Sequence, residues 1–325
     1  MNTKHPELKQ LFHCGRFPSY IRTLCDQLEN CLKNQDNTQL ESLLNSVYEN
    51  SELLDFFDHY SAFIPTMDLY RRVLIIKRKL ALQHEITAEI KTGTKTVLES
   101  LENYLAPPSP GNFENETLKY MILPTAVQLQ PNEKPTAVLH YIYYEPAAVP
   151  DDQWLANQFY SFKDQPQAIE YFETLVDEIK VNLFFQKRPG VRSRIDIPEI
   201  RWPHYGILFD HQVVGRTYGG ALMILMLLGY METLCGSKGH GFGGYAPGTM
   251  IQAVIEPDGT LKPTNHPLIK TDTFLNEYDT HDVRLIFAEG SQEELGLKYQ
   301  QGKFIIGNHS IARDKVIFVK NTGEL

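Results

Sequence analysis

The sequence predicts a protein of mixed α/β class, in which a helical region is followed by a larger region of strands and helices. Three observations support this prediction. Between about residues 17 and 105, apolar residues recur every three or four positions, which is the period of amphipathic helices. A proline-rich stretch, APPSPGN at 106–112, then ends that pattern because prolines cannot continue a helix. Beyond it, alternating and β-branched runs indicate strands.

The N-terminal region is expected to consist of helices. Helical period is visible in YIRTLCDQLENCL, TQLESLLNSVYENSELLDFF and LYRRVLIIKRKLALQHEI, and Pro65 separates the third segment from the second. A last helix covers VLESLENYL, and Gly93 is expected to interrupt it. We therefore predict a helical domain over 1–105, a linker over 106–114 and an α/β domain over 115–325.

The C-terminal region is expected to mix strands and helices. YMILPTAVQL and TAVLHYIYYEP should pair as strands, and PQAIEYFETLVDEIKVNLFF has helical period. YGILFDHQVV is expected to be a strand that leads into Gly215. The apolar run that follows, within 221–235, predicts a buried helix, since a membrane span needs about 20 apolar residues in succession. GTMIQAVIEPDGTLKP predicts two strands around a turn, and DVRLIFAE and KVIFVK predict two more.

Composition and charge exclude several classes of protein. The chain has a formal net charge of −9 at pH 7, which disfavours nonspecific nucleic-acid binding because that binding depends on basic side chains. The basic stretches RRVLIIKRK, at 71–79, and KRPGVRSR, at 187–194, are expected to be a solvated helix face and a polar loop. Neither a signal peptide nor a membrane span is expected, so we predict a soluble, cytoplasmic protein.

Neither the cysteines nor the histidines are spaced as metal ligands. Zinc sites typically use paired C-x-x-C spacing, and two histidines on one helix face would be four residues apart. Three cysteines lie near the N-terminus and one lies far away, at Cys14, Cys25, Cys31 and Cys235. We expect reduced thiols, no metal and no cofactor.

A glycine-flanked turn precedes the apolar helix, in HQVVGRTYGGALMILMLLGYMETLCG at 211–236. Gly215 and Gly219 on either side of Thr217 allow a sharp turn. A helix that begins there would direct free N–H groups at any oxyanion beside the hydroxyl. The same stretch is also compatible with a tight loop in which the glycines serve packing alone.

This region resembles the proteolytic domain of the Lon protease family in the order of its elements and in several residues. GRTYG, at 215–219, is similar to the family's G-P-S-A-G, with Thr217 at the serine position. PDGTLKPTNHPLIK, at 257–270, is similar to L-R-G-x-V-L-P-x-G-G-x-x-x-K, with Lys270 at the position of the catalytic lysine. VRLIFAEGSQEEL looks like the family's strand before an acidic helix. The resemblance covers about 195–300 well and 115–195 by element order only.

The resemblance implies a hydroxyl–lysine dyad, in which the neutral amine of Lys270 takes the proton of Thr217 as its oxygen attacks a peptide carbonyl. Burial beside apolar neighbours would lower the pKa of that lysine, as a base requires. Lys262 is the alternative lysine, and we expect it to be solvated. N–H groups at the start of the helix near residue 220 would stabilise the oxyanion. The other residues of the nucleophile loop would be Gly215, Arg216, Tyr218 and Gly219.

Departures from the family pattern support a second hypothesis, a catalytically inactive Lon-like domain, or pseudoenzyme, that acts as a protein-interaction scaffold. Threonine replaces the serine, and Val214 replaces the aspartate before the first glycine. Residues 252–254, QAV, stand in place of the family's T-G-E strand and suggest largely apolar surroundings. A register shifted by one would put Tyr218 at the nucleophile position and leave no peptidase.

The first hypothesis is an ATP-independent peptidase, a hydrolase that cleaves protein or peptide substrates. No G-x-x-x-x-G-K-[ST] motif is present, and GHGFGG, at 239–244, follows a helix instead of a strand, so we interpret it as a flexible loop. The N-terminal helices are expected to select substrates or to bind a protein partner, and a homo-oligomer is left open. Nucleic-acid binding is a third hypothesis, which the net charge disfavours.

Overall fold

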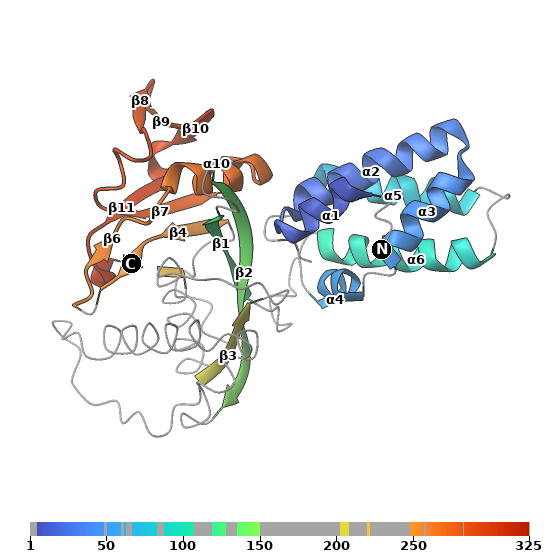
Figure 1. Cartoon of the computed structure of the whole chain (residues 1–325), viewed down its shortest axis with the longest axis horizontal. Helices are drawn as coiled ribbons and strands as arrows, with labels where there is room; N and C mark the ends of the chain where they lie inside the picture. The colour runs from blue at the N-terminus through green and yellow to red at the C-terminus, as the bar shows by residue number, and fades with distance from the viewer. Residues whose placement is uncertain are drawn as a thin grey trace. The chain divides into compact units, whose positions relative to one another are not determined.

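The computed structural model has the mixed α/β class expected from the sequence (Figure 1). The chain divides into two compact units, residues 1–118 and 119–325, and each is treated by itself below. The residues that the structure describes are 5–48, 51–59, 62, 67–82, 88–106, 119–127, 135–149, 202–207, 220–221, 248–256, 258–281 and 283–324.

Helices make up the described part of the first unit. Proline lies in the first turn of α1 and of α2, where its missing N–H would have had no helical partner. α2 ends at Gln35 in the left-handed conformation, a common helix stop. In order, the helices are α1 (Pro6–His13), α2 (Phe17–Asn34), α3 (Asn37–Tyr48), α4 (Ser51–His59), α5 (Met67–Leu82) and α6 (Ala88–Leu105).

The core of the first unit is rich in aromatic side chains. Phe17 of α2 lies 4.7 Å from Phe56 of α4 between ring centroids, and Phe57 lies 4.8 Å from Tyr104 of α6. All four are buried, and ring pairs at these separations add to the gain from burying apolar surface. The cluster therefore fastens α2, α4 and α6 to one another.

Two helix predictions for this unit were wrong. The single helix expected over TQLESLLNSVYENSELLDFF is two helices, α3 and α4. The expected interruption at Gly93 is absent, because α6 runs through that residue without a break. One glycine inside a helix costs only about 1 kcal/mol, which the buried residues Val97, Leu98 and Leu101 of α6 can offset.

The second unit begins with an antiparallel sheet of order β1-β2-β3. β1 (Lys119–Val127) pairs with β2 (Thr136–Val149) in the register Leu123 to His140, which confirms the predicted strand pair. β3 (Trp202–Ile207) pairs with the other edge of β2. Residues 121–125 of β1 are all buried, so both faces of this strand are covered.

A parallel sheet of order β11-β7-β4 follows, from β4 (Thr249–Gln252), β7 (Arg284–Ala288) and β11 (Val316–Val319). β7 is its central strand and is buried from residue 285 to 288, as expected for a parallel strand covered on both faces. β1 lies beside β4, and the helix α10 (Pro267–Glu277) packs against β1 and β2. The contact of β1 with β4 thus brings the first sheet against the parallel sheet.

Short strands complete the second unit. β5 (Val254–Ile255) and β6 (Leu261–Lys262) form the hairpin predicted around the turn at residue 258. GTMIQAVIEP was expected to be one strand, but it divides into β4 and β5, which belong to different sheets. A third antiparallel sheet consists of β8 (Lys298–Gln300), β9 (Lys303–Ile306) and β10 (His309–Ala312). Short 3-10 helices cover Arg313–Lys315 and Thr322–Glu324.

The acidic helix that the resemblance implied after β7 is absent, since residues 289–296 form consecutive turns. Within the ranges given above, no helix is long and apolar enough to cross a membrane. The same residues contain no group of three or more His, Cys, Asp or Glu side chains arranged to hold a metal ion.

Candidate active site

Lys270 lies in the first turns of α10 and is only 2% exposed. The helix begins at Pro267, whose ring fixes a helical φ. His266 precedes it in the left-handed conformation (φ 53°, ψ 49°), so the chain reverses sharply on entering the helix. Pro267 and Thr271, on either side of Lys270 in the helix, are buried as well.

Burial lowers the pKa of Lys270 from its ordinary value of 10.5 to about 8, because an ammonium ion is poorly solvated inside a protein. The negative charge of Glu294 has the opposite effect and raises the pKa. In the described part of the chain, no ion pair or hydrogen bond holds the ammonium group of Lys270. The exposure of 2% confirms the expected burial of Lys270. Its lowered pKa suits the amine to accept a proton near neutral pH.

A buried polar network lies next to Lys270. Gln252, at the end of β4, donates its amide N–H to the hydroxyl of Thr271, at 2.9 Å. Thr264 donates its hydroxyl to the amide oxygen of the same glutamine, at 3.3 Å. The hydroxyl of Thr271 in turn donates to the carbonyl of Pro267, at 2.7 Å. These bonds attach α10 to the sheet one residue beyond Lys270.

The expectation that residues 252–254 provide largely apolar surroundings was wrong at Gln252. This side chain is completely buried, and both ends of its amide are hydrogen-bonded. A buried amide without partners would cost free energy, so partners within the fold are required. They come from Thr264 and Thr271, which lie 12 and 19 residues away in the sequence. No local pattern connects them to Gln252.

Gly220 and Ala221 are helical and buried, which agrees with the start of the predicted apolar helix. The N–H of Gly220 donates to the carbonyl of Ala253, at 3.3 Å. A Cβ atom on Gly220 would lie 2.9 Å from Cδ1 of Ile251, so the absence of a side chain allows this close approach. The helix start therefore lies against the junction of β4 and β5.

The same hydrogen bond corrects one detail of the expected oxyanion site. An N–H group stabilises an oxyanion only if it is not already donated to another acceptor. Because the N–H of Gly220 is donated to Ala253, any oxyanion donors must come from other residues of the turn. The N–H of Gly220 is the first one of this helix among the described residues.

Lys262, the alternative lysine, lies on β6 with 61% of its side chain exposed and forms an ion pair with Glu256, at 3.1 Å. This agrees with the expectation that Lys262 is solvated. Of the two lysines, Lys270 has the surroundings of a base.

Several predicted residues lie outside the described residues. They include the threonine of the expected dyad and the rest of its loop: Gly215, Arg216, Thr217, Tyr218 and Gly219. The glycine-rich segment 239–244, the basic stretch 187–194 and Cys235 also lie outside. The other three cysteines are free thiols.

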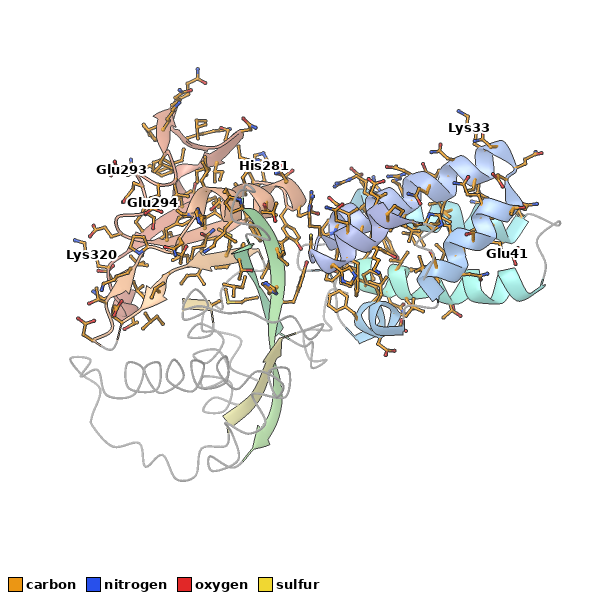
Figure 2. The ribbon with its side chains drawn as sticks, viewed as in Figure 1. Lys33, Glu41, His281, Glu293, Glu294 and Lys320 are labelled. Carbon is orange, nitrogen blue, oxygen red and sulfur yellow. The ribbon has the colours of Figure 1, made fainter. Side chains whose placement is uncertain are left out.

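Sequence reasoning missed the contribution of the turns that follow β7. Glu294 in these turns influences Lys270, and Figure 2 labels it beside Glu293. Gly290 would place a Cβ atom 3.5 Å from Pro263, so the turns lie against the segment that leads into α10. Ser291 is completely buried, and its hydroxyl has no hydrogen-bond partner among the described residues.

Comparison of the chain with protein-family models and with curated protein sequences gave no match.

Proposed function

We propose that this protein is an ATP-independent, Lon-like peptidase in which Thr217 is the nucleophile and Lys270 is the general base. The observation that carries the proposal is the burial of Lys270, with a pKa lowered to about 8. An ordinary lysine is protonated at neutral pH and cannot accept a proton. At a pKa of about 8, roughly one molecule in ten has the neutral amine at pH 7.

The proposed reaction has two halves. The amine of Lys270 takes the hydroxyl proton while the oxygen of Thr217 attacks the peptide carbonyl, and the resulting ammonium gives that proton to the leaving amine. An ester between the threonine and the substrate remains. Water then attacks the ester, Lys270 accepts a proton from the water and returns it to the threonine oxygen, and the carboxylic product leaves.

The described contacts support a short path between the two proposed residues. Gly220, three residues after Thr217, donates its N–H to Ala253. Gln252, the neighbour of Ala253, binds Thr271, the neighbour of Lys270. Three residues of extended chain span at most about 10 Å, so attachment of both segments to the end of β4 favours a meeting of the two side chains.

The test is cleavage of a fluorescently labelled unfolded casein by the full-length protein without ATP. Lys270→Ala and Thr217→Val should each abolish cleavage, and the double variant should be no worse, because residues that act as a unit are not additive. Lys262→Ala removes an exposed lysine and should retain activity. Cleavage at the wild-type rate by the Lys270→Ala protein would overturn the dyad.

The pH dependence gives a second measurement. Since only the neutral amine is a base, the rate should rise about tenfold from pH 7 to pH 9 and level off near pH 9. Removing the opposing charge with Glu294→Gln should move this rise to lower pH. A rate that continues to rise through pH 10 would indicate a lysine of ordinary pKa.

A catalytically inactive scaffold is the alternative function, and the engaged N–H of Gly220 favours it because that group cannot serve an oxyanion. Failure of folded wild-type protein to cleave casein at any pH between neutral and 10 would support the scaffold. In either role we expect the protein to act in the cytoplasm, where the thiols of Cys14, Cys25 and Cys31 stay reduced.

A further inference from the structure

The outer face of α5 is apolar and basic, whereas the exposed face of a helix is ordinarily polar. Its inner face carries the buried residues Leu69, Val73, Ile76 and Leu80. The opposite face, named here the α5 outer face, follows the helical spacing of four, four, three and four residues. It consists of Met67, Arg71, Ile75, Arg78 and Leu82.

Three large apolar side chains on this face are in contact with water. Met67 is 43% exposed, Ile75 52% and Leu82 69%. The described residues expose five large apolar side chains, so a single helix face holds most of them. Scattered exposed apolar residues need no explanation, but a row of them often indicates a binding surface.

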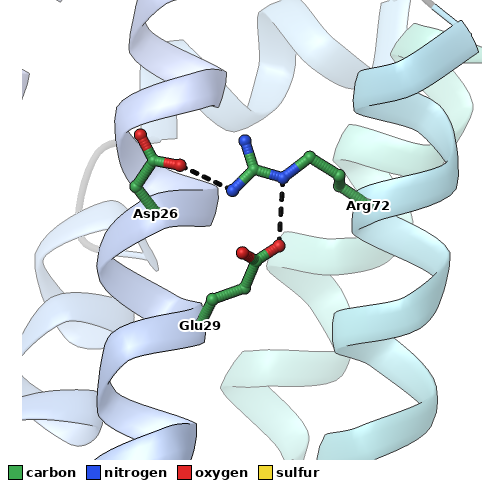
Figure 3. Close-up of polar contacts among 3 residues, drawn as sticks. All are labelled: Asp26, Glu29 and Arg72. Carbon is green, nitrogen blue, oxygen red and sulfur yellow. Dashed lines mark hydrogen bonds and ion pairs between the residues drawn. The ribbon is translucent and has the colours of Figure 1, made fainter.

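Neighbouring helices neutralise two basic residues of α5 that do not belong to its outer face. Figure 3 shows that Arg72 binds Asp26 and Glu29 of α2, at 2.6 and 3.0 Å. Lys77 binds Glu102 of α6 at 2.6 Å. The carboxylates of Asp26, Glu29 and Glu102 are thereby engaged.

Arg71 and Arg78, in contrast, are exposed. Among the described residues they form no ion pair. Lys79 adds a third exposed cation beside them, and Asp68 is the one acidic residue in the α5 sequence. The outer face therefore has an excess of positive charge in a chain whose net charge is −9.

We propose that the α5 outer face binds an acidic amphipathic helix of a partner protein. The partner helix would place a row of apolar residues on Met67, Ile75 and Leu82 and carboxylates opposite Arg71 and Arg78. From Met67 to Leu82 the surface extends about 22 Å, which matches four turns of a partner helix. This proposal concerns the first unit and does not depend on peptidase activity.

The positive charge of the α5 outer face favours this partner over two other possible occupants, a second copy of the chain and an anionic membrane. A second copy docking through the same face in antiparallel orientation would bring Arg71 against Arg78 of the other copy, and like charges in contact are unfavourable. An anionic membrane is far wider than one helix, so the net charge of −9 on the whole chain opposes its approach, whereas a partner helix contacts the basic face alone. An acidic helix instead gains both apolar contact and opposite charge.

The test uses the full-length protein and two synthetic helical peptides of about 18 residues. Both peptides carry leucines at positions three and four residues apart, with glutamates on the flanks of one and lysines on the flanks of the other. Fluorescence anisotropy should show micromolar binding of the glutamate peptide, which weakens as salt is added, and no binding of the lysine peptide.

Variants then locate the binding surface. Arg71→Glu with Arg78→Glu should weaken binding of the glutamate peptide at least about tenfold and create binding of the lysine peptide. Ile75→Asp should weaken binding of both. The matched control is Lys9→Glu with Lys33→Glu, which changes charge equally at exposed positions of α1 and α2; Lys33 is labelled in Figure 2. Unchanged circular dichroism would show that the variants are folded.

Three results would overturn the proposal. The first is no binding of the glutamate peptide at millimolar concentration. The second is equal binding of the two peptides, since contact would then not depend on charge. The third is an equal loss in the control variant and in the Arg71→Glu, Arg78→Glu variant, since the net charge of the chain and not the α5 outer face would then determine binding.

Discussion

Replacement of Lys270 by methionine should make the second unit more stable at neutral pH. The pKa of this lysine falls from 10.5 to about 8 on burial, and one unit of pKa corresponds to about 1.4 kcal/mol. The folded state therefore carries a penalty of about 3 kcal/mol while the amine is protonated. Methionine has nearly the same volume without the charge, so Lys270→Met should recover most of that free energy.

The sign of the pH dependence follows from the lowered pKa. Between about pH 8 and 10.5 the unfolded chain holds the proton more tightly than the folded protein, so wild-type stability rises with pH across this window. Below pH 8 both states are protonated and the whole penalty applies. The advantage of Lys270→Met should accordingly be full at pH 7 and vanish towards pH 10.5.

Urea unfolding followed by tryptophan fluorescence is the suitable assay. Both tryptophans, Trp154 and Trp202, belong to residues 119–325, so the signal reports on the second unit. Lys262→Met is the matched control, because Lys262 is 61% exposed and its replacement should change stability by less than about 0.5 kcal/mol. A destabilised Lys270→Met protein, or a gain of equal size at pH 7 and pH 10, would refute the reasoning.

Three further predictions concern stability. Gln252→Leu should cost about 1 to 3 kcal/mol in the same tryptophan assay, because it removes the acceptor of the buried Thr264 hydroxyl and the amide that donates to Thr271, and a loss near zero would contradict the network. Phe57→Ala should cost about 3 to 5 kcal/mol of the stability of the first unit, measured by circular dichroism, and a smaller loss would show that the aromatic cluster is loosely packed. Gly307→Ala should destabilise more than Gly302→Ala by tryptophan fluorescence, since both glycines have positive φ but only the former would bring a Cβ atom 2.8 Å from the carboxylate of Asp272; equal losses would exclude that clash.

Much of the fold could be predicted because its signals are local. Helical period predicted α2 and α5, and alternating β-branched runs predicted the pair β1 and β2. Boundaries were harder to predict. The division between α3 and α4 and the continuity of α6 through Gly93 depend on which side chains are buried by neighbouring helices, and the helix period does not contain that information.

The candidate site also combines features that the sequence indicates locally with features that depend on packing. Lys270 was identified from the sequence, and its burial was expected from Leu268 and Ile269 beside it. The polar network of Gln252, Thr264 and Thr271 was not expected, because those residues come together only when α10 packs against the end of β4. Glu294, in turns that follow a later strand, likewise affects the pKa of Lys270.

The sequence by itself determined the mixed α/β class and the order of its helical and strand-rich regions, since period and turn residues are properties of neighbouring residues. The tertiary structure alone decided the electrostatics. Burial lowers the pKa of Lys270, Glu294 opposes that effect, and the ion pairs of Arg72 and Lys77 leave Arg71 and Arg78 available on the α5 outer face. Solvation and charge pairing depend on distances between groups far apart in the chain, and those distances exist only after folding.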